Sequence, residues 1–190
     1  MSNIKFSVDV ENGSVGRKIR RRIEDGIDNA ASEINDEMRS VAKGKIKTEN
    51  AVFRGELLAG FVNSKVTFGD STVASLRNLS DHAAYQDRGV SGTQRSRKTP
   101  YKYRNKKPPI ASLIPWVEQN LTGAFWPDNL DRSGAGDLNS ETRDLAFWLQ
   151  DKIFREGIEG IHFMKDARLW AEKNAADVTA KNISKELRKL

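Results

Sequence analysis

The chain opens with alternating apolar and polar residues, and the period then changes to that of a helix. Apolar side chains stand at every second position from Ile4 to Val10, which predicts a half-buried strand within residues 1–14. From Val15 the apolar residues recur every third or fourth position as far as Ala42. This spacing predicts one long amphipathic helix that ends near Gly44.

The first turns of this predicted helix are strongly basic. Five cations fall within two turns, namely Arg17, Lys18, Arg20, Arg21 and Arg22. Positive charge is a poor match for the positive end of a helix dipole. The residues therefore either lie on a solvated face or contact something anionic, and the sequence leaves both interpretations open.

The next segment predicts a small antiparallel sheet. Residues 53–61 contain two glycines and are interpreted as a turn that leads into a strand, because glycine weakens a helix. Residues 61–68 and 72–79 alternate weakly in polarity, and Gly69-Asp70 between them favours a hairpin turn.

A long basic loop follows, within residues 90–109. The segment before it, from Asp81, is interpreted as the end of a strand that turns at Gly89, where glycine accepts a positive φ. The loop itself is almost wholly polar and ends in Pro108-Pro109. Because of its length and polarity we expect it to be mobile in the isolated subunit.

Eight basic residues and two tyrosines in and beside this loop are the candidate contacts with DNA or a protein partner. They are Arg88, Arg95, Arg97, Lys98, Tyr101, Lys102, Tyr103, Arg104, Lys106 and Lys107. Cations can contact phosphates, and aromatic rings can stack on bases or anchor a protein interface. A solvated loop without any partner is the alternative.

Three helices are predicted in the second half of the chain. They cover residues 112–121, residues from about 140 to Gly157, and residues from Phe163 to the end. Residues 123–139 are interpreted as an irregular insertion, and residues 172–190 as a C-terminal helical extension whose last turns fray.

These elements predict an α+β fold, with the long N-terminal helix and the C-terminal helices packed on a small antiparallel sheet and joined by long polar loops. We expect one domain over residues 1–190. Its core should pair the apolar stripe of the long helix with that of the penultimate one. The two sets are Ile19, Ile23 and Ile27, and Trp148, Leu149 and Ile153.

Composition narrows the classes of protein. The chain has no cysteine, which excludes disulfides and thiolate metal sites and favours a reducing compartment. The net charge of +6 allows an anionic partner such as nucleic acid. No signal-peptide pattern is visible and no apolar run approaches the roughly 18 residues of a membrane span, so we expect a soluble protein made in a cytoplasm.

No motif in the sequence indicates catalysis. His82 and His162 are far apart and lack metal-ligand spacing, and no nucleophile motif or phosphate-binding loop occurs. Asp128, Asp131 and Asp137 could bind a cation, but their spacing fits no known loop. We therefore expect no enzyme activity, no cofactor and no metal.

The order of motifs resembles the neck and tail-completion proteins of tailed phages, of the minor tail protein Z type. The resemblance spans about residues 15 to 171. Its motifs are a turn after the long helix, a segment before the basic loop, a proline-containing helix and a closing segment: Arg54-Gly-Glu-Leu57, Ala83-Ala-Tyr-Gln-Asp-Arg-Gly89, Leu113-Ile-Pro-Trp-Val117 and Gly157-Ile-Glu-Gly-Ile-His-Phe-Met-Lys-Asp-Ala167. Arg54 replaces the family's threonine and Asp87 its glutamate, and residues 123–139 look like an insertion.

The resemblance implies a non-enzymatic virion protein that forms a ring, commonly six-fold, between the head connector and the tail tube. It implies as partners further copies of the chain, the connector and tube proteins and, in the channel, genomic DNA. The alternative is a free nucleic-acid-binding protein that uses the basic loop. Within a ring, the loop could link subunits through Tyr101 and Tyr103 or line the channel by charge, and we favour the linking role.

Overall fold

The structure of the protein is a computed structural model that describes residues 13–49, 55–68, 71–120 and 138–190. The predicted N-terminal strand and the acidic residues Asp128, Asp131 and Asp137 lie outside these ranges. The chain divides into two compact units where a single domain was expected. Unit 1 comprises residues 1–83 and 162–190, and unit 2 comprises residues 84–161.

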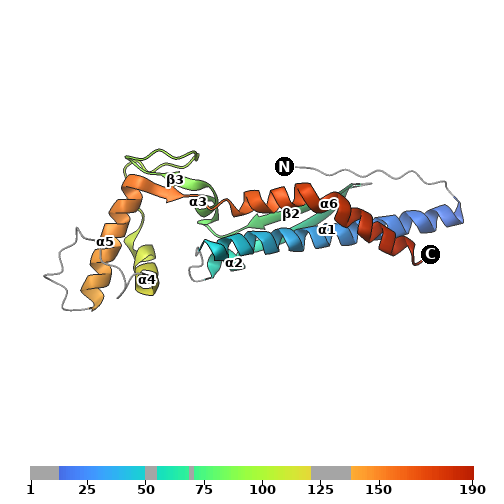
Figure 1. The fold of residues 1–190 in the computed structure, drawn as a ribbon, viewed down its shortest axis with the longest axis horizontal. Coiled ribbons are helices and arrows are strands. Elements are labelled where there is room, and N and C mark those ends of the chain that lie inside the picture. Colours follow the sequence, from blue (N-terminus) through green and yellow to red (C-terminus); the bar gives the residue numbers. More distant parts are fainter. Residues whose placement is uncertain (1–12, 50–54, 69–70, 121–137) are drawn as a thin grey trace. The chain divides into compact units, whose positions relative to one another are not determined.

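Unit 1 contains two long helices, one short helix and a β-hairpin (Figure 1). Its elements are α1 (Ser14–Thr48), α2 (Glu56–Ala59), β1 (Phe61–Phe68), β2 (Ser71–Asn78) and α6 (Phe163–Leu187). Unit 2 contains most of α3 (Ala83–Arg88), with β3 (Gly89–Ser91), α4 (Ile110–Asn120), α5 (Leu138–Glu156) and β4 (Gly157–Glu159). The fold is α+β, as predicted.

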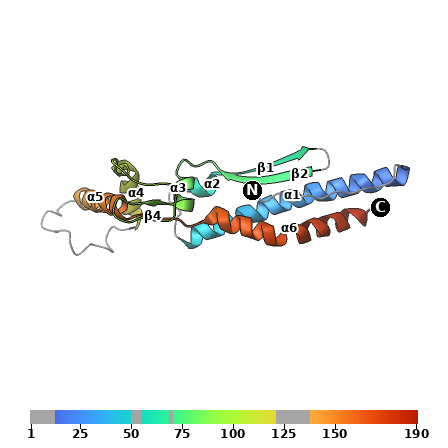
Figure 2. The ribbon, with the colours of Figure 1, turned by 90° about the horizontal axis from the view of Figure 1, so that it is seen from above.

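Helices α1 and α6 run side by side in opposite directions (Figure 2). Small side chains line their contact, and the buried ones on α1 include Ala30, Ala31 and Ala42. Small residues let two helix backbones approach closely. Helix α6 is continuous to Leu187 and stays buried at intervals as far as Glu186. One side of residues 172–187 therefore belongs to the packing of unit 1 against α1, and the segment is more than an extension.

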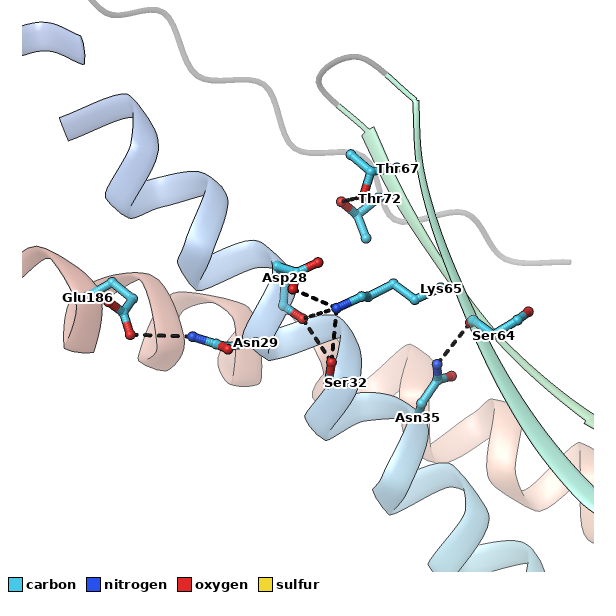
Figure 3. A network of polar contacts seen from close by, with 9 residues as sticks. All are labelled: Asp28, Asn29, Ser32, Asn35, Ser64, Lys65, Thr67, Thr72 and Glu186. Atoms are coloured by element: carbon cyan, nitrogen blue, oxygen red, sulfur yellow. Dashed lines mark hydrogen bonds and ion pairs between the residues drawn. The ribbon is translucent and has the colours of Figure 1, made fainter. Parts of the chain in front are cut away.

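The hairpin of β1 and β2 packs on α1, and its inner side combines the buried Phe61 and Leu76 with polar contacts to the helix (Figure 3). The Lys65 ammonium lies 2.6 Å from the Asp28 carboxylate. The Asn35 amide, which is 2% exposed, donates to the backbone oxygen of Ser64 over 3.1 Å. These bonds fix where β1 lies along α1, and the antiparallel register sets Val66 opposite Val73.

Two local expectations from the sequence are wrong. Residues 56–59 form a short helix rather than only a turn: Gly55 takes a left-handed conformation (φ +71°) immediately before it, and Leu57 is buried. Residues 83–88 form helix α3 and not the end of a strand, which accords with the high helix propensity of its two alanines. The positive φ expected at Gly89 is present, at +76°.

The expected pairing of α5 with α1 is also wrong. In unit 2, Leu145 and Ala146 of α5 pack against Val117 of α4, and all three are fully buried. The α1 stripe is covered by α6 instead. Trp148 is only half-buried, with the Lys152 ammonium 5.0 Å from its ring centre.

Strands β3 and β4 form a three-residue antiparallel ladder in unit 2, with Val90 opposite Ile158. Gly157, at φ +78°, ends α5 as predicted, and it also lets the strands meet closely. A Cβ at this position would lie 2.0 Å from the backbone oxygen of Val90. No helix within the described ranges is both long and apolar enough to cross a bilayer.

Candidate interaction surfaces

The basic loop is tied to its own unit by backbone hydrogen bonds around Ser91. The backbone amide of Ser91 donates to the backbone oxygen of Tyr101 over 2.8 Å. The backbone amide of Tyr103 donates to the backbone oxygen of Ser91 over 2.9 Å. The Ser91 hydroxyl donates to the backbone oxygen of Arg97 and accepts from its amide. The loop therefore doubles back on itself and has structure within the subunit, contrary to the expectation that it would not fold on its own.

Arg97 connects the loop to the end of α5 and to β4. Its Nε donates to the backbone oxygen of Glu156 over 3.1 Å, and its Nη1 lies 3.2 Å from the Glu159 carboxylate. The amides of Thr93 and Gln94 donate to the last carbonyls of α5. The last carbonyls of a helix have no hydrogen-bond donors within the helix. The loop supplies these donors at the C-terminal end of α5.

Both tyrosines of the loop pack inside unit 2. The Tyr101 ring meets the Tyr85 ring edge-on with centroids 4.7 Å apart, and the Tyr103 ring lies 6.1 Å from that of Phe154. Burial raises the pKa of the Tyr103 phenol, and Tyr85 adds to the shift. The rings contribute to the subunit's own packing, which removes the main reason for expecting them to anchor a neighbour.

The structure therefore divides the ten residues selected from the sequence into two groups. Arg97, Tyr101 and Tyr103 hold the loop, and Lys107 pairs with Asp151 of α5. The other six are exposed, and no ion pair is found for them within the described part of the chain: Arg88, Arg95, Lys98, Lys102, Arg104 and Lys106. These six cations are the part of the loop that is available to a partner.

The hairpin carries a second candidate interaction surface besides the basic loop, and none of its residues is among the ten candidate contacts. Val62, Val66 and Phe68 of β1 and Val73 of β2 share one face and are between 42% and 68% exposed. We call these four residues the outer hairpin face. The polar set of β1, including Asn63 and Lys65, is the one that bonds to α1.

Phe61 and Leu76 on the side toward α1 are buried, but the four residues of the outer hairpin face remain exposed among the described residues. A strand normally turns its apolar side toward the core and its polar side toward water. Val62, Val66 and Phe68 stand at alternate positions of β1, and this pattern could have indicated the outer hairpin face from the sequence. The pattern predicts only that one face of the strand is buried. The pattern does not identify the surface that would cover this face.

Neither histidine belongs to a recognisable site. Within the described ranges, no group of three or more His, Asp or Glu side chains is placed to hold a metal ion. Helices α4 and α5 enclose an open groove of about 320 Å³, lined mainly by Ile110, Ile114 and Phe147 with Thr142, Arg143 and Glu118.

Comparisons with protein-family models, with curated proteins and with solved structures find no match for this chain. Its function is therefore inferred from its own residues and geometry.

Proposed function

We propose that this chain is a structural virion protein of a tailed-phage neck, which forms a ring that joins the head connector to the tail tube. The observation that carries the proposal is the outer hairpin face. Its four apolar side chains are exposed in the subunit while the polar side of β1 is used against α1. An apolar face of this kind is typical of a surface that another chain covers.

The hairpin is also open at its edges. Among the described residues, β1 and β2 pair only with each other, so each strand has one edge with unpaired backbone groups. Such edges readily pair with another strand unless they are protected. A closed ring is one assembly in which every copy gives and receives the same contact, so that no surface is left over. The order of motifs along the chain supports a neck protein as the particular ring.

The contact with the connector, the tube or the DNA is proposed to use charge. The six exposed cations of the basic loop lack ion pairs within the described residues, whereas Tyr101 and Tyr103 already pack in unit 2. We therefore no longer favour linking through the tyrosines. The same six cations favour the second candidate function, a free nucleic-acid-binding protein.

The test is a triple variant of the outer hairpin face, Val62→Thr, Val66→Thr and Phe68→Thr. Threonine keeps a high strand propensity, so the hairpin should form while its apolar face is lost. The matched control is Leu169→Thr on α6, which changes an apolar side chain that is 46% exposed in the same unit. Assembly would be followed by mass photometry of the protein and by electron microscopy of particles produced with each variant.

We expect the parent and the control to form rings and joined particles, and the triple variant to leave heads and tails separate. One or two copies of the parent chain per particle would contradict the proposal. So would assembly of the triple variant at the parental level. A parent that stays monomeric and binds DNA in a salt-sensitive way would favour the second candidate function instead.

A further inference from the structure

The antiparallel pairing of α1 and α6 brings together two basic segments that are far apart in the sequence. The first turns of α1 lie beside the last turns of α6, because Arg22 approaches Glu186 to 3.4 Å. Gly26, one turn further along α1, packs directly on the backbone of Ile183. The basic run at the start of α1 and the lysine-rich end of α6 thus form one surface of unit 1.

Some cations in this region are used within the subunit. The Glu186 carboxylate is buried and is bonded by Arg22, Asn29 and Lys189. Lys181 lies 3.4 Å from Glu33. These contacts fix the end of α6 against α1, so the surface is held by the fold before any ligand arrives.

Six other cations at this end are exposed, and no ion pair is found for them among the described residues. We call them the end patch: Arg17, Lys18, Arg20, Arg21, Lys185 and Arg188. No acidic residue lies in the first turn of α1 to balance them. The positive end of the α1 dipole disfavours a cation such as Arg17 in the first turn and favours a bound anion there.

We propose that the end patch binds the phosphate backbone of double-stranded DNA without reading its sequence. Arg and Lys side chains are the usual phosphate contacts in such complexes. The described helix segments that carry the patch, residues 13–29 and 178–190, contain no aromatic residue, so they lack the stacking groups with which proteins hold single-stranded bases. Of the residue types that typically dominate a protein–protein interface, the patch has arginine but none of the Trp, Tyr or Met side chains that supply its apolar centre.

A membrane surface fits the patch less well. A helix that lies on a lipid surface needs a broad exposed apolar face beside its cations. Here the apolar stripe of α1 is turned away from the basic face, and Ile19 and Ile23 are half-buried. Val15 and Leu190 are the exceptions, at 67% and 62% exposed, and two isolated residues, one in α1 and one after the end of α6, do not make a broad apolar face. This surface belongs to unit 1, whereas the basic loop belongs to unit 2.

The test measures binding of the full chain to a fluorescent 20-base-pair duplex by anisotropy at several salt concentrations. Three charge-reduced sets are compared, each removing three cations by substitution with glutamine. The end-patch set is Arg17, Lys18 and Arg21; the loop set is Arg95, Lys98 and Lys102; and the matched control is Lys47, Lys165 and Lys173. Circular dichroism would verify that each protein is folded.

We expect the end-patch set to weaken binding at least tenfold at low salt and to flatten its salt dependence. Each lost phosphate contact lowers the slope of log K against log salt by about 0.9. A fourfold rise in salt should then weaken the parent about 40-fold more than it weakens the end-patch set. The control set should bind like the parent.

Several results would overturn the assignment. Absence of duplex binding by the parent would do so, as would equal effects of the end-patch and control sets. A loss confined to the loop set would place the contact in unit 2. Tighter, patch-dependent binding to phosphatidylserine vesicles than to the duplex would assign the patch to membranes. Ring formation is measured separately without DNA, so a failure here is distinguishable from a failure of the proposed neck function.

Discussion

Gly26 of α1 lies against the backbone of Ile183 in α6, so closely that a Cβ at residue 26 would be 2.7 Å from the Ile183 Cα. Real Cβ contacts are not this short, so the two helices can approach as they do only with glycine at this position. The contact lies beside the Arg22–Glu186 ion pair. Two of our predictions test this region.

Gly26→Ala should destabilise unit 1 although alanine is the better helix former. The helix propensity gained is about 1 kcal/mol, whereas forcing a side chain into a packed contact typically costs about 1–3 kcal/mol. Urea denaturation followed by circular dichroism would measure the change. Gly44→Ala is the control, since it lies in the same helix with no atom within 4 Å of an added Cβ. It should stabilise the protein by about 0.5–1 kcal/mol, and a gain of the same size at residue 26 would contradict the close packing.

Glu186→Gln should destabilise the protein near neutral pH and matter less in acid. The hydrogen bond from Lys189, with the charges of Lys189 and Arg22, holds the pKa of Glu186 below its usual range, although burial opposes the shift. A lowered folded-state pKa means that the carboxylate's contribution is complete above its unfolded pKa of about 4.3. It is lost as the pH falls through the lower, folded value.

Melting temperatures of the parent and of Glu186→Gln should therefore differ most near neutral pH and converge below about pH 4. Glu37→Gln, at an exposed site on α1, removes the same charge and serves as the control. A difference between parent and Glu186→Gln that stays constant across this range would show that the effect does not depend on the charge.

Arg97→Ala should loosen the basic loop without unfolding unit 2. The Arg97 side chain is only 17% exposed, and its Nε donates to the Glu156 carbonyl, so this hydrogen bond is the stronger of its two contacts. The pair with Glu159 contributes less, because that carboxylate is 84% exposed. Losing a hydrogen bond to a charged donor costs about 1.5–3 kcal/mol, so exchange of the loop amides should speed by tenfold or more.

Hydrogen exchange followed by mass spectrometry would detect this change in peptides that cover residues 91–103. Arg95→Ala is the matched control, since its side chain is exposed and no ion pair is found for it among the described residues. Equal exchange rates in the two variants would show that the Arg97 side chain does not stabilise the loop.

Leu145→Ala should destabilise the α4–α5 pair more than Trp148→Ala does. Leu145 is fully buried beside Val117, and truncating such a leucine typically costs about 2–5 kcal/mol. Trp148 is half-buried, so its loss removes less packing. Exchange protection of α4 and α5 peptides would compare the two variants, and a larger loss of protection in Trp148→Ala would place the core on the other side of α5.

The sequence by itself determined most of the elements. Periods of three to four and of two predicted α1, the hairpin, α4, α5 and α6, because a regular element shows its buried side as a repeat in residue type. Glycine predicted the positive φ of Gly89 and the end of α5 at Gly157, since few other residues take that conformation. The basic loop was also correctly located.

Only the tertiary structure decided which faces meet. An apolar stripe requires a cover but does not name it, so α1 was assigned to α5 although α6 covers it. The contact depends on small residues such as Gly26, whose role is to leave space. The loop is held partly by side chains such as Arg97 and partly by backbone hydrogen bonds around Ser91, and the backbone groups are common to nearly all residue types, so they left no signal in the sequence. The outward turn of Val62, Val66 and Phe68 was decided by the tertiary contacts of β1, because Lys65 and Asn63 on its other side bond to Asp28 and Asp36 of α1.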